Sequence, residues 1–284
     1  MGNRKTPILI YIIMTFFAAN SLITRYLLYG EHTTPFTLTA LRFLSGFLML
    51  YIISFILPGF KGRLVFNENT LVGSLFLGIY AYSISYGYHL VSASSGVLVF
   101  YLSVVLTMSL VSVLEGSERF NVRTLVGVFL GLIGVMVITQ TGFGLLSLLG
   151  LFLMVSTGVS WGLYCVKARE NIDSFEYTYS TFFLLSVFII LVSITGYAFK
   201  PGMIWVDSGG CFCYALFLGM VSTALSYFLW NNVIGELKPS QGALSQLIVP
   251  ILTSLLGVLI LGEEFSYSLI LGGALIVMGI KLNS

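Results

Sequence analysis

The sequence predicts an all-α integral membrane protein with ten transmembrane helices, arranged as two five-helix repeats of inverted topology. Three observations support this prediction: the composition, the apolar segments with their flanking charges, and a weak internal repeat. Of the 284 residues, 57% are hydrophobic and 8% are charged, whereas soluble domains carry roughly 25% charged residues. A soluble protein of this size could not hide so much apolar surface from water, so a lipid bilayer is the expected surrounding.

Turn and charge signals divide the chain into ten apolar segments, each close to the length of roughly 20 residues that crosses a bilayer as a helix. Each run is long and continuous, which favours helices over the alternating segments of about 10 residues found in membrane barrels. The first run is too long for a signal peptide, and we expect it to be the first span. The segments are 7–28, 35–57, 71–90, 95–114, 122–138, 148–166, 176–199, 212–231, 240–261 and 268–282.

The distribution of Lys and Arg predicts a cytoplasmic (inner) membrane protein with both termini in the cytoplasm. If the N-terminus is cytoplasmic, only Arg25 and Lys200 fall on the outer side. The bias supports ten spans, because removing one span would move later basic loops to the wrong side. The cytoplasmic set is Arg4, Lys5, Lys61, Arg63, Arg119, Arg123, Lys167, Arg169, Lys238 and Lys281.

A shift of 146 residues reveals a weak internal repeat, in which "SSGVLVFYLSVVLT" (94–107) lies over "SQGALSQLIVPILT" (240–253). We therefore divide the chain into a first five-helix repeat, 1–141, and a second, 142–284. Five is odd, so the second repeat must begin on the opposite side. This is the inverted-repeat design of secondary transporters, which places the substrate site near the midplane between the halves.

Two glycine-rich segments, 122–138 and 268–282, occupy equivalent positions in the two repeats. Glycine allows helices to approach closely in lipid, so these segments are expected to pack against other helices or to form a dimer face. We expect them to lie away from the substrate.

Several stretches resemble the drug/metabolite transporter superfamily, and within it the EamA-type family. They include "FTLTALRFLSGFLML", "SASSGVLVFYLSVVLTMSLVSVLEGSERF" and "ALSYFLWNNVIGELKPSQGALSQLIVPILT", and the similarity runs over nearly the whole chain. The resemblance implies a ten-helix inverted repeat with a central cavity lined mainly by the third, fourth, eighth and ninth spans. It also implies export or exchange of amino acids and other small metabolites. The chain departs from the family pattern at Val104, where a proline is often found, and keeps the equivalent Pro250.

Helical periodicity selects candidate substrate-binding residues in the third segment. Tyr82, Tyr86 and His89 fall within an arc of about 100°, whereas Tyr80 and Tyr88 point elsewhere. Tyr88 is typical of the interfacial aromatic belt.

In the ninth segment, Pro250 frees the carbonyl of Gln246, so Gln246 is expected to offer its amide and its main-chain oxygen to a cavity. Polar side chains of this kind also join helices by hydrogen bonds, and Trp230 also fits a structural role at a helix end. The predicted substrate-binding set is Asn20, Tyr82, Tyr86, His89, Tyr101, Trp161, Tyr164, Tyr227, Trp230 and Gln246.

Arg42 is the one charge well inside a segment, and we expect a structural arginine that snorkels outward or pairs with an acid, Glu31 being nearest in sequence. No carboxylate lies in the middle of a segment, and only His89 could carry protons. Facilitated exchange is therefore at least as well supported as proton coupling. The scarcity of basic residues argues against phosphorylated substrates. The three cysteines fit no metal or disulfide framework, so no cofactor or metal is predicted.

We therefore expect a secondary transporter rather than an enzyme. Its substrate would be a small metabolite, an amino acid or a related neutral or aromatic compound, exported or exchanged by alternating access. The alternative is a multidrug or organic-cation exporter of the same fold, because aromatic cavities attract cations. Remote alternatives are an intramembrane hydrolase, suggested by "ASSG" near His89, and a non-transporting scaffold.

The expected partners are the small-molecule substrate and the lipid bilayer, with the protein as a monomer or homodimer. A net charge of +2 is too small to suggest a nucleic acid.

Overall fold

The computed structural model describes residues 5–91, 93–116, 122–139, 148–171, 173–199, 206–261 and 267–282. Within these ranges the regular elements are helices, apart from one isolated β-bridge between Thr33 and Val206. The elements are α1 (Lys5–Tyr29), α2 (Pro35–Ile56), α3 (Glu68–Leu90), α4 (Ala93–Leu114), α5 (Val122–Thr139), α6 (Leu148–Arg169), α7 (Ser174–Phe199), α8 (Gly209–Gly219), the π-helix η1 (Met220–Leu225), α9 (Ser226–Ile234), α10 (Pro239–Ser245), α11 (Ile248–Leu261) and α12 (Tyr267–Lys281).

The ten expected segments are helical over their described residues, apart from the last residue of the second and of the tenth, but two of them are interrupted. The eighth consists of α8, η1 and α9 in succession, and the ninth breaks between α10 and α11 at 246–247.

Five helical stretches in the described residues are long and apolar enough to cross a membrane, so length and apolarity alone do not confirm ten spans. The five are Pro7–Leu28, Pro35–Ile56, Leu148–Arg169, Ser174–Thr195 and Gly209–Ile234, and the shorter apolar helices are Val99–Leu114, Leu125–Val137 and Ile270–Lys281.

Helices α2 and α3 begin at well-defined caps. Thr34 accepts a hydrogen bond from the backbone N–H of Thr37 at 3.1 Å, and Pro35 occupies the first turn of α2. Asn67 and Thr70 form a reciprocal capping box at the start of α3, with bonds of 2.9 and 3.0 Å. Both arrangements satisfy backbone N–H groups that a helix leaves without intrahelical partners.

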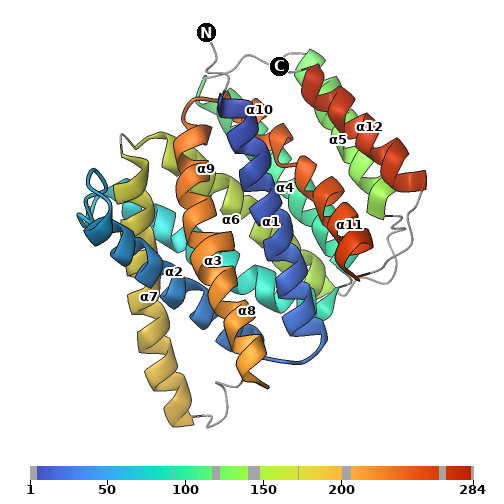
Figure 1. Cartoon of the computed structure of the whole chain (residues 1–284). Helices are drawn as coiled ribbons and strands as arrows, with labels where there is room; N and C mark the ends of the chain where they lie inside the picture. Colours follow the sequence, from blue (N-terminus) through green and yellow to red (C-terminus); the bar gives the residue numbers. More distant parts are fainter. Residues whose placement is uncertain are drawn as a thin grey trace.

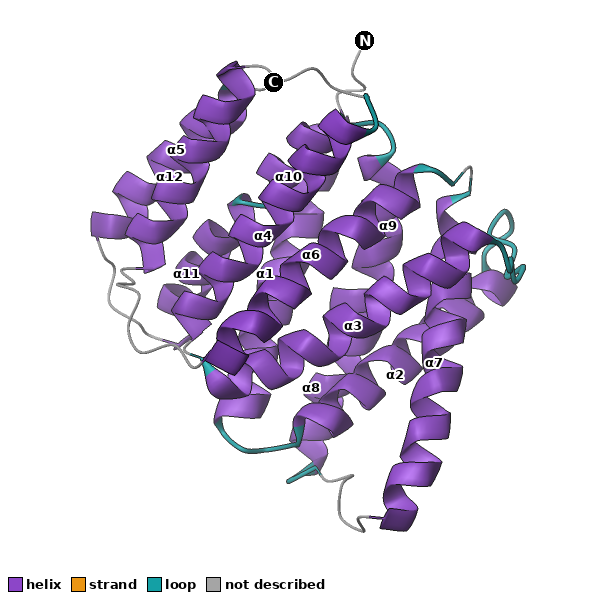
Figure 2. Ribbon diagram, turned by 180° about the vertical axis from the view of Figure 1, so that it is seen from behind, coloured by secondary structure: helices purple, strands orange, loops and turns teal. Residues whose placement is uncertain are grey.

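The helices form one bundle in which α1 lies beside α9 and α11, and α3 packs against α6 (Figures 1 and 2). The first turn of α1 and the last turn of α12 lie at the same end of the bundle (Figure 1). The largest core cluster is rich in aromatic residues from several helices, including Phe17, Tyr80, Trp161 and Tyr227.

The glycine-rich helices α5 and α12 form a close pair at one edge of the bundle (Figures 1 and 2). A Cβ atom added at Gly134 would meet the carbonyl oxygen of Gly272 at 2.5 Å, and one at Gly279 would meet the carbonyl oxygen of Gly127. The backbones can approach this closely only because these positions lack side chains. The expected helix packing is confirmed.

Large apolar side chains cover much of the outer surface. Phe55 is 74% exposed, Leu148 86% and Phe152 66%. A surface with many such side chains on helix after helix suits contact with lipid rather than water.

Candidate functional site

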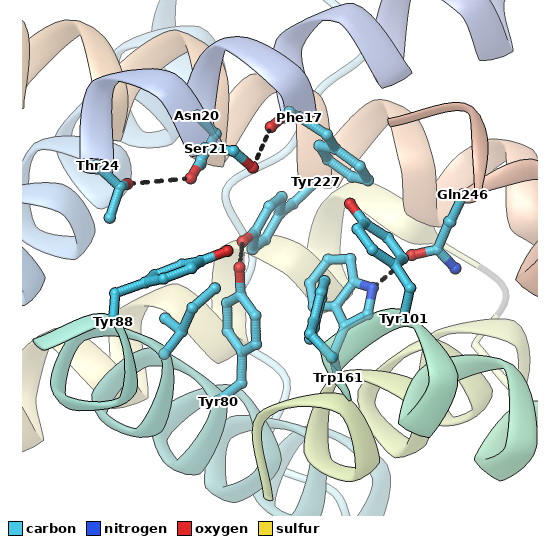
Figure 3. A pocket seen from close by; sticks show the side chains of 12 residues that line it. Phe17, Asn20, Ser21, Thr24, Tyr80, Tyr88, Tyr101, Trp161, Tyr227 and Gln246 are labelled. Carbon is cyan, nitrogen blue, oxygen red and sulfur yellow. Dashed lines mark hydrogen bonds between the residues drawn. The ribbon is translucent and has the colours of Figure 1, made fainter. Parts of the chain in front are cut away.

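A small cavity lies where α1, α3, α4, α6, α9 and the break between α10 and α11 meet (Figure 3). Its volume is about 30 Å³. Sites for drug-sized ligands occupy roughly 300–1,000 Å³, so this conformation is nearly closed around the site. The lining residues are Phe17, Asn20, Ser21, Thr24, Tyr80, Ile84, Tyr88, Phe100, Tyr101, Trp161, Tyr227 and Gln246.

Aromatic rings form one wall of the cavity. The Trp161 ring centroid lies 5.0 Å from that of Tyr80 and 4.7 Å from that of Tyr227. Phe17 meets the rings of Trp161 and Tyr227 edge-on, each at 5.8 Å. Such offset and edge-to-face geometries are the favourable ones for aromatic pairs, and they hold the wall in place.

The helix break at 246–247 positions Gln246 in the cavity. The Trp161 indole N–H donates to Gln246 Oε1 at 2.6 Å, and Gln246 Nε2 donates to the carbonyl of Gly242 at 3.4 Å. The expectation that the Gln246 main-chain oxygen is free for a ligand was wrong, because it accepts the backbone N–H of Val249 at 3.0 Å. Pro250 lies in the first turn of α11, where its missing N–H costs no helical bond.

Arg42 is buried behind the cavity, with 2% of its surface exposed. Its Nη2 donates to the hydroxyls of Tyr227 at 2.6 Å and Tyr80 at 3.1 Å, and its Nε donates to Thr223 Oγ1 at 2.8 Å. The expected outward snorkelling and the expected pairing with an acid were both wrong. All the hydrogen-bond acceptors of this guanidinium in the described residues are neutral hydroxyls.

Five predicted site residues line the cavity: Asn20, Tyr101, Trp161, Tyr227 and Gln246. Asn20 Nδ2 donates to Thr223 Oγ1 at 3.0 Å and to the carbonyl of Ser222 at 3.2 Å.

Two other predicted residues, Tyr164 and Trp230, are buried outside the cavity lining. The Tyr164 ring stacks on Trp161 at 5.5 Å, and its hydroxyl accepts from Asn231 Nδ2 at 2.9 Å. Trp230 Nε1 donates to Cys165 Sγ at 3.3 Å.

Tyr82, Tyr86 and His89 do not line the cavity. Tyr82 contributes instead to a separate groove of about 550 Å³ between α3 and α7, which Phe188 also lines. Tyr86 is 43% exposed, and His89 is exposed near the end of α3. The predicted face of α3 therefore points away from the cavity, which corrects the expected placement of these three side chains.

Tyr80 and Tyr88, which were predicted to point elsewhere, line the cavity together with Ile84. These three residues are spaced four apart, and that spacing aligns side chains on one helix face. The spacing of Tyr80 and Tyr88 was therefore a usable signal. Phe17 and Ser21 on α1, one turn apart, carry a similar signal.

A second cluster lies at the end of the bundle where α1 meets α2. The His32 and Asp207 side chains are 3.2 Å apart, and ligand atoms of His32, Asp207 and Cys211 all lie within 4.8 Å of one another. This set could hold a metal ion, although the cysteine spacing alone predicted no such group.

Two stretches, residues 4–140 and 148–284, match the sequence profile of the EamA-like transporter family. The chain belongs to the EamA-like transporter family. It is 32% identical to the uncharacterized protein PA1977 of Pseudomonas aeruginosa, over 100% of this chain and 98% of that protein. It is 24% identical to the uncharacterized transporter YoaV of Bacillus subtilis, over 88% and 87% of the two chains.

A solved crystal structure has the same fold, with a TM-score of 0.82 at 20% identity over 100% of this chain and 98% of the other. The EamA family match, the relatives named as transporters and the apolar helices together identify an integral, multi-pass membrane transporter.

Proposed function

We propose that this EamA-family protein is a secondary transporter that exports or exchanges a small metabolite by alternating access. The proposed substrate is an amino acid or a related neutral or aromatic compound. The observation that carries the proposal is the buried cavity between helices of the two matched halves, which combines an aromatic wall with hydroxyl and amide groups.

The nearly closed cavity supports alternating access as the mechanism. A volume of about 30 Å³ cannot admit a metabolite of this class, so the helices must separate before a substrate enters. Phe17, Tyr80 and Tyr101 belong to the first half of the chain, whereas Trp161 and Tyr227 belong to the second. Rocking of one half against the other would open the site, as in other inverted-repeat transporters.

The proposed topology is ten spans in two inverted five-helix repeats, 1–141 and 142–284, in the cytoplasmic membrane with both termini cytoplasmic. Support comes from the two family matches of similar length and from the ten helical segments. The start of α1 and the end of α12 also lie at one end of the bundle, as an even number of spans requires (Figure 1).

The test is uptake of labelled amino acids and aromatic metabolites into proteoliposomes that contain the purified protein. Vesicles preloaded with unlabelled substrate should take up label faster than empty vesicles, and a pH gradient should not drive uphill accumulation. Saturable uptake of at least one compound is expected. If no compound of the panel crosses faster than in protein-free vesicles, the proposal fails.

Two matched variants connect the uptake to the cavity. Tyr101→Ala removes a cavity-lining ring that is 4% exposed, whereas Tyr11→Ala removes a ring on α1 that is 58% exposed. We expect uptake to fall at least about tenfold in the first variant and to remain close to wild type in the second. Equal uptake by both variants would contradict the assignment of this cavity as the substrate site.

A further inference from the structure

We propose that the Tyr80 hydroxyl, held in place by Tyr227 and the buried Arg42, forms an oxyanion-binding subsite that selects substrates carrying a carboxylate and disfavours organic cations. This inference rests on the proposed transport function and specifies the charge of the substrate. Figure 3 shows the two phenol groups and the small space in front of them, and Arg42 donates hydrogen bonds to both phenol oxygens.

Arg42 places a positive charge next to the cavity. A charged side chain within a membrane-spanning helix is costly and is usually found where function requires it. The ion pairs that the structure describes are His32 with Asp207 and Lys167 with Glu170, and neither includes Arg42. Among the described residues, the charge is stabilised by hydroxyl groups and by the faces of Phe43, Tyr80 and Tyr227, whose centroids lie 5.3 to 5.9 Å away. The cavity region therefore keeps a positive potential.

The hydrogen bonds among Arg42, Tyr80 and Tyr227 leave one phenol proton without an acceptor in the described residues. Tyr227 donates to the Tyr80 hydroxyl at 2.8 Å, and both oxygens accept hydrogen bonds from Arg42. Each phenol carries one proton, and one of the two lies in the bond between the rings. Nothing in the described part of the chain accepts the other, which belongs to Tyr80. Because Tyr80 lines the cavity, its proton is available to a ligand.

The cavity lining offers more hydrogen-bond donors than acceptors to a ligand. Tyr101 also lines the cavity, and the described residues offer no hydrogen-bond partner to its hydroxyl. The cavity lining contains no Asp or Glu, and the Gln246 side-chain oxygen already accepts from Trp161. Free donors and a positive charge, without an acidic partner, match a carboxylate. An ammonium group would meet repulsion and few acceptors.

The aromatic wall completes the substrate class. Phe17, Phe100 and Trp161 surround the subsite with apolar rings. A ligand with an anionic end and an apolar or aromatic body would satisfy the phenol protons at one end and the rings at the other. Hydrogen bonds to an ionised acceptor are roughly twice as strong as neutral ones, so the carboxylate should dominate the selectivity.

The experiment measures binding to the purified full-length protein in lipid nanodiscs, so it does not depend on transport. Phenylacetate, methyl phenylacetate and phenethylamine share one aromatic ring and differ in charge. Quenching of tryptophan fluorescence reports on the site, because Trp161 lies in the cavity. We expect phenylacetate to bind at least about tenfold more tightly than the ester or the amine. Sodium chloride at the same concentration should give no quenching.

Tyrosine-to-phenylalanine variants test the subsite without removing a ring. Tyr80→Phe and Tyr227→Phe should each weaken phenylacetate binding about tenfold, with little effect on the ester. Tyr11→Phe, on the exposed surface of α1, is the matched control and should bind like wild type. Arg42→Gln should abolish the preference for the acid, and the two phenylalanine variants test the subsite even if that variant does not fold.

The outcomes separate this inference from the proposed function. Selective binding of phenylacetate without uptake of any compound would contradict transport and leave the subsite intact. Equal binding of acid and ester, tighter binding of phenethylamine, or no binding of phenylacetate would overturn the subsite. Quenching by chloride equal to that by phenylacetate would also overturn it, because the site would then bind simple anions.

Discussion

At the residue scale, the polar side chains next to the cavity mostly hold the helices in register. Asn231 Nδ2 donates to the hydroxyls of Tyr164 and Thr178, both at 2.9 Å, and Asn231 is 1% exposed. Tyr164 in turn stacks on Trp161, which forms the cavity wall. Tyr164 is therefore a supporting residue, one ring removed from the cavity.

Replacing Tyr164 by phenylalanine should lower stability while leaving binding nearly unchanged. The variant keeps the ring and loses one buried hydrogen bond, which contributes about 0.6 to 1 kcal/mol in a membrane protein. We expect the thermal midpoint in detergent to fall by about 2 °C and ligand affinity to change less than about twofold. Tyr51→Phe, at a 44% exposed position of α2, is the control for the thermal measurement. A large loss of affinity at unchanged stability would instead place Tyr164 in contact with substrate.

The chemical types of the site residues could be predicted from the sequence, but the inward face of α3 could not. Tyr82 and Tyr86 share a helix face as expected, yet Tyr80 and Tyr88 are the ones that reach the cavity. In a soluble protein the apolar face of a helix points inward. In a bilayer both lipid and protein interior are apolar, so that rule loses its force. Only the neighbouring helices decide which tyrosines face the cavity.

At the element scale, the glycines of α5 and α12 are matched across one helix pair. Gly279 lies against the carbonyl of Gly127, whereas the nearest atom to a Cβ added at Gly273 would be 3.8 Å away, on Ile251. Helix α12 therefore has one glycine in close contact with a neighbouring backbone, Gly279, and another six residues away, Gly273, with room for a methyl group. Close packing of this kind is the usual role of small residues in membrane helices.

Gly279→Ala should therefore destabilise the α5–α12 pair, and Gly273→Ala should not. The first substitution forces two backbones apart and should cost about 1 to 3 kcal/mol. The second meets ordinary contact and should be neutral or stabilising by up to about 1 kcal/mol, since alanine favours helix. Thermal unfolding of the two variants gives the comparison, and size-exclusion chromatography tests the dimer alternative. If Gly279→Ala changed only the oligomeric state, this face would be a subunit interface instead.

The break between α10 and α11 is a second feature at the element scale. The backbone N–H groups of Gln246 and Leu247 bond three residues back rather than four, to Ala243 and Leu244 at 3.3 and 3.0 Å. This tight turn directs the Gln246 side chain at Trp161. Pro250 ensures that the helix cannot continue unchanged through the break.

Pro250→Ala should allow α10 and α11 to join into one helix and so misplace Gln246. The new N–H can complete a regular ladder, so we expect stability to be unchanged or higher. Uptake should nevertheless fall, because the Trp161 to Gln246 bond depends on the break. Uptake assays and thermal unfolding on the same preparation separate the two effects. Lower stability together with unchanged uptake would show that the break serves folding rather than the site.

At the scale of the whole molecule, two of the side-chain hydrogen bonds between the two halves of the chain meet at one residue, Thr223. Thr223, in the π-helix η1, accepts from Asn20 on α1 and from Arg42 on α2. Single-turn π-helical segments are frequent at functional sites. The position of η1 within an otherwise α-helical segment places Thr223 against both first-half helices.

The helical segments could be predicted because bilayer thickness sets the length of each apolar run. The contacts between halves could not, since Arg42 and Thr223 are 181 residues apart and neither carries a local signal of its partner. The π-helix was also unpredictable, because its sequence "MVSTAL" is compatible with an ordinary helix. Tertiary packing, rather than local propensity, decides these features.

Thr223→Val should weaken the closed conformation, because it removes one hydrogen-bond acceptor shared by Asn20 and Arg42 while preserving side-chain shape. A loss of about 1 kcal/mol corresponds to about a fivefold shift in population. The reporter is a Ser21→Cys substitution in the cavity lining. The exposed Cys213 is replaced by serine in the same protein, so that it does not react with the reagent. The rate of labelling by a thiol-reactive, water-soluble reagent in nanodiscs should rise about fivefold. Thr195→Val, at an exposed position on α7 whose hydroxyl bonds only to its own helix, is the matched control. An unchanged rate would mean that other contacts hold the two halves closed.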